Sequence, residues 1–268
     1  MNTTTDAPIA APATPVAAGT TSHAPAIRIE GLGKRFGAAG PVVLEDIDLT
    51  IEPGEFVCLL GASGCGKSTL LGIIAGLELP TTGTVTVTSG SAAVMFQESA
   101  LFPWLTAGRN VELALKLRGV PRARRRSQAL ELLDLVNLAD AAQKRPHELS
   151  GGMRQRVALA RALAQDRKVL LMDEPFAALD AITRDLLHEE LERIWRETGR
   201  TIVFVTHNVR EAARLGQRVL LMKSRPGRIA NEWRIDDTGP RRIESPEVSR
   251  LSVEITDQLR EEIRRNAS

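Results

Sequence analysis

Several common features are scarce in this 268-residue chain. It has only two cysteines, Cys58 and Cys65, too few for a disulfide framework, and we expect both to be reduced thiols of a cytosolic protein. No apolar run reaches the roughly 18 residues needed to cross a bilayer, so a membrane role would need another, spanning chain. A net charge of +2, with basic residues spread along the chain, argues against nucleic acid as a partner. Ser-His-Asp and zinc-ligand patterns are also missing from the sequence.

Composition divides the remainder into three parts. Residues 1–25 are rich in Ala, Pro and Thr and contain no Lys or Arg, so we expect a disordered tail rather than a signal peptide. Between residues 26 and 235, apolar strand patterns alternate with helical ones, which predicts an α/β domain. Residues 236–268 indicate a polar connector and an amphipathic helix, with Ser245 as its N-cap and Pro246 as its first residue.

The strand patterns are of two kinds. Residues 56–60 are continuously apolar, which is typical of a buried parallel strand, and similar runs occur at 169–172, 202–205 and 219–222. Residues 47–51 alternate between apolar and polar, which predicts a half-exposed antiparallel strand. From about Ser99 to Arg161 the pattern is helical, so the predicted fold is a mostly parallel core sheet with an antiparallel β subdomain and an inserted helical subdomain.

A glycine-rich segment directly follows the apolar run that ends at Leu60 and opens a helix at Lys67. Its backbone amides can surround a β-phosphate, and the helix N-terminus adds positive partial charge. In this pattern Lys67 reaches the β- and γ-phosphates, and the hydroxyl of Ser68 binds Mg²⁺. Because strand, loop and helix occur in this order, the sequence predicts nucleotide binding. The expected contact residues are Gly61, Ala62, Ser63, Gly64, Cys65, Gly66, Lys67, Ser68 and Thr69.

Four polar residues end other predicted strands. Asp173 follows a buried strand and can hold Mg²⁺, while the adjacent Glu174 can orient or deprotonate an attacking water. His207 ends the next apolar run, so parallel pairing would bring it to the same sheet edge, within reach of a γ-phosphate. Gln97 can contact Mg²⁺ or the water and pass the nucleotide state to the helical segment, although a plain surface glutamine is the alternative.

Other polar residues favour simpler interpretations. The arginine cluster at residues 122–126 is best explained as a solvated helix start, with acidic lipid as a minor alternative. His23 and His147 have no partners at metal-ligand spacing. His188 lies in a charged helical stretch, and we expect it to be exposed.

A third motif, residues 149–156, is a helix start with Ser150 as its N-cap, followed by Gly151 and Gly152. Together with the phosphate loop and the carboxylate strand, it resembles the ATP-binding subunit of ABC transporters over residues 27–229. The resemblance implies a P-loop NTPase of the ABC type, with ATP and Mg²⁺ held between two subunits that face head to tail. It also implies that these three residues contact the γ-phosphate of the partner's ATP. Asp180 would link the two sites, and Phe36 would stack on adenine.

A narrower resemblance is to the nitrate/sulfonate/taurine branch of bacterial importers, with Ala177 and Asn208 as departures from that branch. It rests on residues 64–67, 101–106, 149–156 and 224–229. It implies an ATPase at the cytoplasmic face of the plasma membrane, paired with a second copy or a paralogous subunit. It also implies an integral permease, touched by Trp104 unless that residue packs within the helical subdomain, and indirectly a solute-binding protein.

Three other functions are weighed against the importer. A soluble ABC-class ATPase acting on DNA would need long heptads, and one acting on ribosomes usually has two ATPase units; the sequence shows neither. An exporter subunit is the nearest transport alternative. A non-hydrolysing regulatory subunit is disfavoured because every residue needed for hydrolysis is present.

Overall fold

The computed structural model of the chain describes residues 24–37, 40–235 and 241–267. Most of the expected N-terminal tail, including His23, therefore lies outside the described residues. Within the described parts, no helix has the length and apolar character that crossing a membrane requires.

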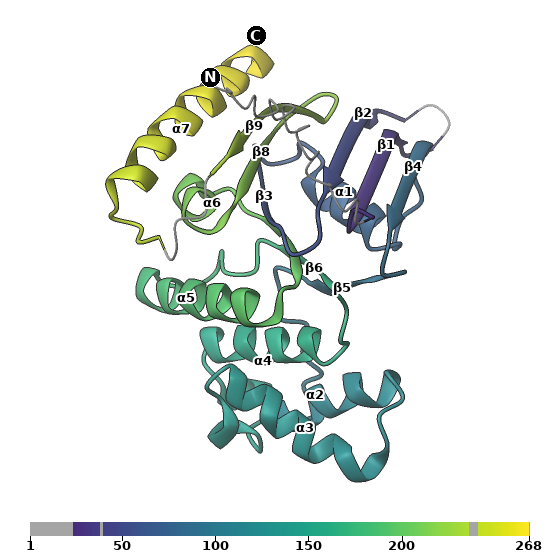
Figure 1. Cartoon of the computed structure of the whole chain (residues 1–268), viewed down its shortest axis with the longest axis vertical. Coiled ribbons are helices and arrows are strands. Elements are labelled where there is room, and N and C mark those ends of the chain that lie inside the picture. The colour runs from purple at the N-terminus through teal and green to yellow at the C-terminus, as the bar shows by residue number, and fades with distance from the viewer. Residues whose placement is uncertain (1–23, 38–39, 236–240, 268) are drawn as a thin grey trace, which may run out of the picture.

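A six-stranded sheet forms the centre of the molecule (Figure 1), and its strand order is β5-β6-β7-β3-β8-β9. Its strands are β3 (Phe56–Gly61), β5 (Ala92–Met95), β6 (Val169–Asp173), β7 (Thr201–Val205), β8 (Arg218–Lys223) and β9 (Arg228–Arg234). The first five strands of this order are parallel, as the sequence predicts, because helices connect them. The antiparallel edge strand β9 was not predicted.

A smaller antiparallel sheet of order β2-β1-β4 packs, together with α1 (Lys67–Ile74), on one face of the large sheet. Its strands are β1 (Ile27–Arg35), β2 (Val42–Ile51) and β4 (Thr82–Val87). It confirms the predicted antiparallel subdomain.

Helices cover the other face of the large sheet. They are α4 (Gly151–Leu163), α5 (Ala181–Thr198), α6 (Val209–Leu215) and α7 (Pro246–Ala267). Along β3, Phe56, Cys58 and Leu60 face this helical layer. Val57 and Leu59 face α1 and the small sheet. The strand is continuously apolar because both of its faces are buried.

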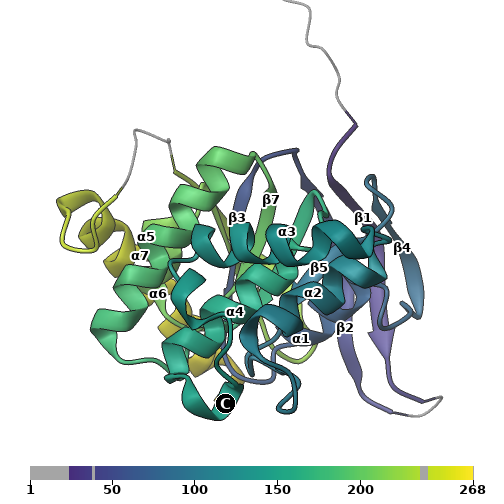
Figure 2. The same cartoon turned by 90° about the horizontal axis from the view of Figure 1, so that it is seen from below.

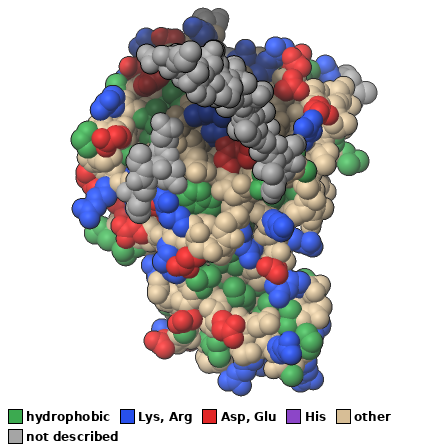
Figure 3. All heavy atoms as spheres, in the orientation of Figure 1, with side chains coloured by type: hydrophobic (Ala, Val, Ile, Leu, Met, Phe, Trp, Pro, Cys, Tyr) green, Lys and Arg blue, Asp and Glu red, His purple; other side chains and the backbone are tan. Residues whose placement is uncertain are grey.

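The segment in which a helical insertion was expected forms a lobe at the lower end of the molecule in Figure 1, and this lobe faces the viewer in Figure 2. It contains α2 (Ala107–Leu117), α3 (Arg122–Leu135), the 3₁₀ turns Ala139–Ala141 and Pro146–Glu148, and α4. Arginines 122, 124 and 126 are exposed at the start of α3, as a solvated helix start predicts. Figure 3 shows Lys and Arg side chains at the tip of this lobe.

The C-terminal helix begins as the sequence predicts. Pro246 is its first residue, and the Ser245 hydroxyl accepts a hydrogen bond from the Val248 amide at 3.3 Å. Val248 and Ile255 are buried, and α7 packs along α6.

Candidate nucleotide-binding and catalytic site

A hollow of about 400 Å³ lies at the carboxyl end of the central strands, beside the start of α1. The phosphate loop forms one wall of it through Ser63, Gly64 and residues 66–69, and Gln97, Asp173 and Glu174 form another. Val43, from the small sheet, also lines the hollow, although no sequence pattern pointed to it. The fold therefore brings residues from four separate stretches of chain around one space, which is large enough for a polyphosphate.

The phosphate loop depends on glycine at position 66. Its φ of +100° lies in the left-handed region, and a Cβ there would stand 2.5 Å from Leu44 Cδ2. Lys67 is almost fully buried, and its ammonium donates hydrogen bonds to the carbonyl oxygens of Gly61 at 2.8 Å and Ala62 at 3.0 Å. The loop thus places a cation and the free amides of a helix start at the same point, which suits a polyphosphate.

Cys65 lies inside this loop with its side chain buried. Burial raises the pKa of its thiol, although the nearby Lys67 ammonium acts in the opposite direction. A protonated thiol carries no negative charge that would repel phosphates, and the backbone amides of the loop bind the anion. Cysteine at this position therefore fits the predicted loop.

Asp173 and Ser68 form the candidate magnesium pair. Asp173 ends β6, where burial raises the pKa of its carboxyl group, while a hydrogen bond from the Ser68 hydroxyl and the Lys67 charge lower it. A hydroxyl, a carboxylate and the side-chain amide of Gln97 are oxygen donors of the kind that Mg²⁺ prefers. No cluster of three or more His, Cys, Asp or Glu suited to a metal exists among the described residues. The donor set fits an ion that keeps several waters and is completed by substrate phosphates.

Glu174 and His207 meet at the neighbouring strand end. Strands β6 and β7 pair in parallel, and the Glu174 amide donates to the carbonyl oxygen of Val205 at 3.0 Å. Glu174 has a φ of +43°, which is unusual for a side-chain-bearing residue and turns the chain away from the strand direction. Its Oε2 lies 2.9 Å from His207 Nδ1, so the imidazole holds this carboxylate at the rim of the hollow.

Gln97 follows the edge strand β5, and its backbone is fixed by the helical lobe. The side-chain amide of Gln155, on α4, donates to the Gln97 carbonyl oxygen at 2.8 Å. Gln155 was missed, although it lies within the 149–156 motif, because sequence alone does not show which side of a helix faces the nucleotide loop. This contact joins Gln155, which lies beyond the first turn of α4, to the backbone of a residue that lines the hollow.

The predicted residues that do not line the hollow are Gly61, Ala62, Cys65 and His207, which neighbour or contact lining residues, and Phe36, Ser150, Gly151, Gly152 and Asp180. Ser150 is an exposed N-cap of α4 and accepts from the Met153 amide at 3.2 Å. Gly151 and Gly152 follow it at the helix N-terminus, and a Cβ on Gly152 would collide with Thr183 of α5. A single chain therefore leaves this helix start apart from its own phosphate loop.

Asp180 and Phe36 also lie at the surface. Asp180 caps α5 by accepting from the Thr183 amide at 3.0 Å, and this hydrogen bond lowers the pKa of its carboxyl group. The Phe36 side chain is 46% exposed, and the Lys34 ammonium lies 4.7 Å from its ring centroid. An exposed ring with a neighbouring cation is compatible with a stacked base and its phosphates.

The expectation that His188 is exposed was wrong. Its imidazole is fully buried between α5 and α6, against the ring of Phe176 at a centroid distance of 5.6 Å. Burial lowers its pKa to about 3, and the positive charges of Arg214 and Arg184 add to this effect. Its neighbour Glu189 is exposed, because successive residues on a helix point in directions about 100° apart. The charged residues next to His188 in the sequence therefore do not indicate which side of the helix His188 occupies.

Comparison with known proteins identifies the family. A family model described as ABC transporter matches residues 44–177. The nitrate import ATP-binding protein NrtD of Synechocystis sp. is 46% identical over 252 residues, which covers 87% of this chain and 95% of that protein. The taurine import ATP-binding protein TauB of Pseudomonas syringae pv. tomato is 44% identical over 218 residues, covering 78% and 83%. The dimeric structure of MJ0796, a bacterial ABC transporter cassette, superposes with a TM-score of 0.70 at 35% identity, covering 78% and 99%. This chain therefore belongs to the ABC transporter family, as one of its ATP-hydrolysing subunits.

Proposed function

We propose that this chain drives an importer for a small solute of the nitrate, sulfonate and taurine class, working with a separate permease at the cytoplasmic face of the plasma membrane. The observation that carries the proposal is the single hollow that gathers Lys67, Ser68, Asp173 and Glu174, with His207 bound to the last of these. The names of two relatives, for nitrate and taurine import, support the solute class.

The residues of the hollow have distinct roles in this proposal. The loop amides of residues 61–69 and the Lys67 ammonium bind the phosphates of ATP. Ser68, Asp173 and Gln97 provide the oxygen ligands for Mg²⁺, which would neutralise charge on the β- and γ-phosphates.

Glu174 is the residue we assign to the attacking water. Its carboxylate orients the water or accepts its proton, and the 2.9 Å contact with His207 fixes the direction of that carboxylate. The His207 side chain is 62% exposed, so the other edge of its ring is free to approach the γ-phosphate.

A second subunit, either a copy of this chain or a paralogue, completes the site. The N-terminus of α4, with Ser150, Gly151 and Gly152, has free amides and positive partial charge but lies apart from its own hollow. In a symmetric head-to-tail pair it would meet the γ-phosphate held by the partner, and Asp180 would reach the partner's loop. Phe36 would stack on adenine.

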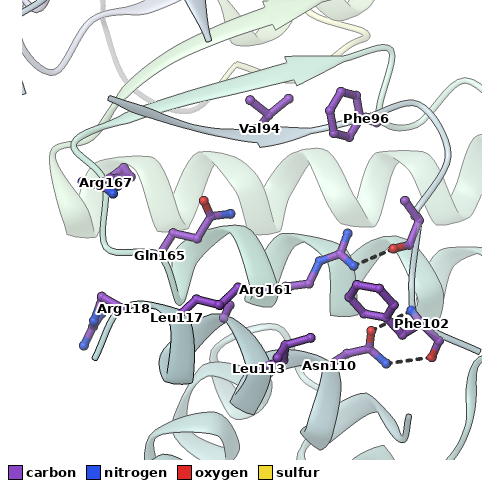
Figure 4. Close-up of a pocket in the computed structure, with 12 residues that line it drawn as sticks. Val94, Phe96, Phe102, Asn110, Leu113, Leu117, Arg118, Arg161, Gln165 and Arg167 are labelled. Carbon is purple, nitrogen blue, oxygen red and sulfur yellow. Dashed lines mark hydrogen bonds between the residues drawn. The ribbon is translucent and has the colours of Figure 1, made fainter. Parts of the chain in front are cut away.

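A groove between the end of β5 and the helical lobe is the proposed permease contact (Figure 4). Its volume is about 440 Å³, and its apolar lining includes Phe96, Phe102 and Leu117. Asn110 holds one side of this groove in place, because its side-chain oxygen accepts a hydrogen bond from the Phe102 amide at 2.9 Å. Trp104 lies beside it, 67% exposed, with its ring 5.4 Å from that of Phe102. Exposed aromatic side chains of this kind often anchor interfaces. A solute-binding protein would act only through the permease.

The chemistry is tested with Glu174→Gln. The amide keeps the shape of the side chain but cannot accept a proton, so turnover falls by about 10²-fold or more while ATP binding and ATP-driven dimer formation persist. Hydrolysis is measured by phosphate release, and dimer formation by gel filtration with ATP. Wild-type turnover would remove Glu174 from its assigned role.

The importer assignment is tested by purifying tagged protein from its native membranes in mild detergent and identifying what copurifies by mass spectrometry. A multi-helix permease with a solute-binding protein is expected, and ligands of the latter would name the solute. Trp104→Ala should lose the permease but keep ATP hydrolysis, whereas Val253→Ala, which changes a similarly exposed apolar side chain on α7, should retain both. Recovery of only ribosomal or DNA-associated proteins would overturn the transport assignment.

A further inference from the structure

A group of buried and partly buried charged residues lies behind the site, between α5 and α6. One member, Arg184, reaches back to the chain segment that connects Glu174 to Asp180. Its Nη2 donates to the carbonyl oxygen of Leu179 at 2.6 Å and its Nε to that of Phe176 at 3.3 Å. Two carbonyls of this short segment are thus held by one guanidinium.

Glu211, on α6, is the second member of the group. Its Oε1 lies 3.5 Å from Arg184 Nε, and its Oε2 accepts a hydrogen bond from the Thr206 hydroxyl at 2.5 Å. The side chain is buried, which raises the pKa of its carboxyl group, while the Thr206 hydrogen bond and the Arg184 charge lower it. Glu211 therefore connects an arginine of α5 with the residue that immediately precedes His207.

Thr206 and Asn208 enclose His207 from both sides. The Thr206 hydroxyl accepts a hydrogen bond from the Asn208 amide at 3.0 Å. The Asn208 side chain in turn caps α6 by accepting from the amides of Arg210 at 3.0 Å and Glu211 at 3.4 Å. The backbone around His207 is therefore tied to Glu211 by two independent routes, although the imidazole itself is mostly exposed.

We propose that Arg184, Glu211 and Thr206 form a relay that positions His207 against Glu174 for ATP hydrolysis. These two residues come from different strand ends, and their 2.9 Å contact needs both backbones to be fixed to each other. One end of the relay holds the segment that begins at Glu174, and the other holds the turn that carries His207. The relay residues are positioning residues, and the inference rests on the roles proposed above for Glu174 and His207.

The first test compares two changes at one position in the full-length protein. Thr206→Val keeps the shape of the side chain but removes the hydroxyl, whereas Thr206→Ser keeps the hydroxyl. We expect kcat for ATP hydrolysis to fall at least tenfold in the valine variant, with KM for MgATP within twofold of wild type. The serine variant should stay within twofold in both constants. An unchanged kcat in the valine variant would overturn the relay.

A matched control separates this effect from a loss of stability. Arg218 is paired with Glu55 at 3.1 Å, in a partly buried ion pair at the opposite end of β3 from the phosphate loop. Glu55→Gln should lower the melting temperature and leave kcat unchanged. If Thr206→Val does not fold, Arg184→Lys replaces it, because lysine keeps the charge but cannot reach both carbonyls and Glu211. This variant should show the same fall in kcat, and wild-type kcat would overturn the relay.

The second test asks whether the relay acts through His207. Single-turnover hydrolysis is measured with enzyme in excess for His207→Ala and for the double variant with Thr206→Val. If Thr206 acts by positioning His207, the double variant matches His207→Ala within twofold. A further tenfold loss would overturn the relay. Wild-type hydrolysis by His207→Ala would instead remove the proposed role of His207 itself, so the two failures are distinguishable.

Discussion

The buried imidazole of His188 makes the stability of this protein depend on pH in a way that can be calculated. In the unfolded chain a histidine has a pKa near 6.5, whereas burial lowers that of His188 to about 3 in the folded protein. Between these values the unfolded state binds a proton that the folded state does not. Stability from this group is therefore complete above pH 6.5 and is lost as the pH falls from 6.5 towards 3.

The magnitude follows from the difference between the two states. Each pKa unit corresponds to about 1.4 kcal/mol, so His188 removes about 2 kcal/mol of unfolding free energy at pH 5 and about 0.8 kcal/mol at pH 6. Protonation of the folded state is negligible at pH 5, so the value there depends on the unfolded pKa alone. The charged groups that face the ring are Arg184 and Asp185 on α5 and Glu211 and Arg214 on α6. These four groups carry two positive and two negative charges, so burial remains the main cause of the lowered pKa of His188.

The assay is urea unfolding of wild type and His188→Leu at pH 5, 6 and 7.5. The wild-type protein should lose about 2 kcal/mol more than the variant between pH 7.5 and pH 5. His147→Gln is the matched control, because His147 is exposed in the folded protein, and it should show the wild-type pH dependence. Equal slopes for wild type and His188→Leu, or an NMR titration of His188 near pH 6.5, would refute the reasoning.

Three further predictions concern other buried or strained positions. Gly66→Ala should weaken ATP binding, measured by fluorescent-nucleotide titration, and lower stability by about 1–3 kcal/mol, measured by thermal melting. The control is Gly90→Ala, because Gly90 also has a positive φ but has open space around it; this variant should affect only stability. Asn110→Leu should lower the unfolding free energy by about 2–3 kcal/mol in urea unfolding, because the buried side chain of Asn110 accepts a hydrogen bond from the Phe102 backbone amide and donates one to the Thr106 carbonyl oxygen. Cys65 should react with iodoacetamide at least about tenfold more slowly in the native than in the denatured protein at pH 8, by mass spectrometry, because burial raises the pKa of its thiol. Equal rates would contradict this.

Local chemistry made most of the site accessible to sequence analysis. A continuously apolar strand followed by Gly61, Gly64, Gly66 and Lys67 has one well-known structural use, and strand ends of a parallel sheet share one edge. The placement of Asp173, Glu174 and His207 at that edge follows from the same rule, because β6 and β7 are neighbours. Their roles in hydrolysis stay predictions until the variants above are measured.

Contacts between elements that are distant in sequence could not be predicted. The bond from Gln155 to the Gln97 carbonyl oxygen joins residues 58 positions apart, and no periodicity indicates it. The edge strand β9 was missed because its residues are mostly half-buried and show no regular alternation. Trp104 was open to two interpretations, and its exposure decides against packing within the helical lobe.

By itself, the sequence determined the α/β class, the phosphate loop and the polar strand ends, because these depend on backbone conformation and on the periodicity of burial along one segment. Only the tertiary structure decided that His188 is buried and neutral, and that Arg184, Glu211 and Thr206 connect the segment after Glu174 to His207. It also showed that the start of α4 lies apart from its own nucleotide hollow. These features arise where α5 and α6 pack against the sheet, and burial there depends on the angle at which whole helices meet rather than on the residues next in the chain.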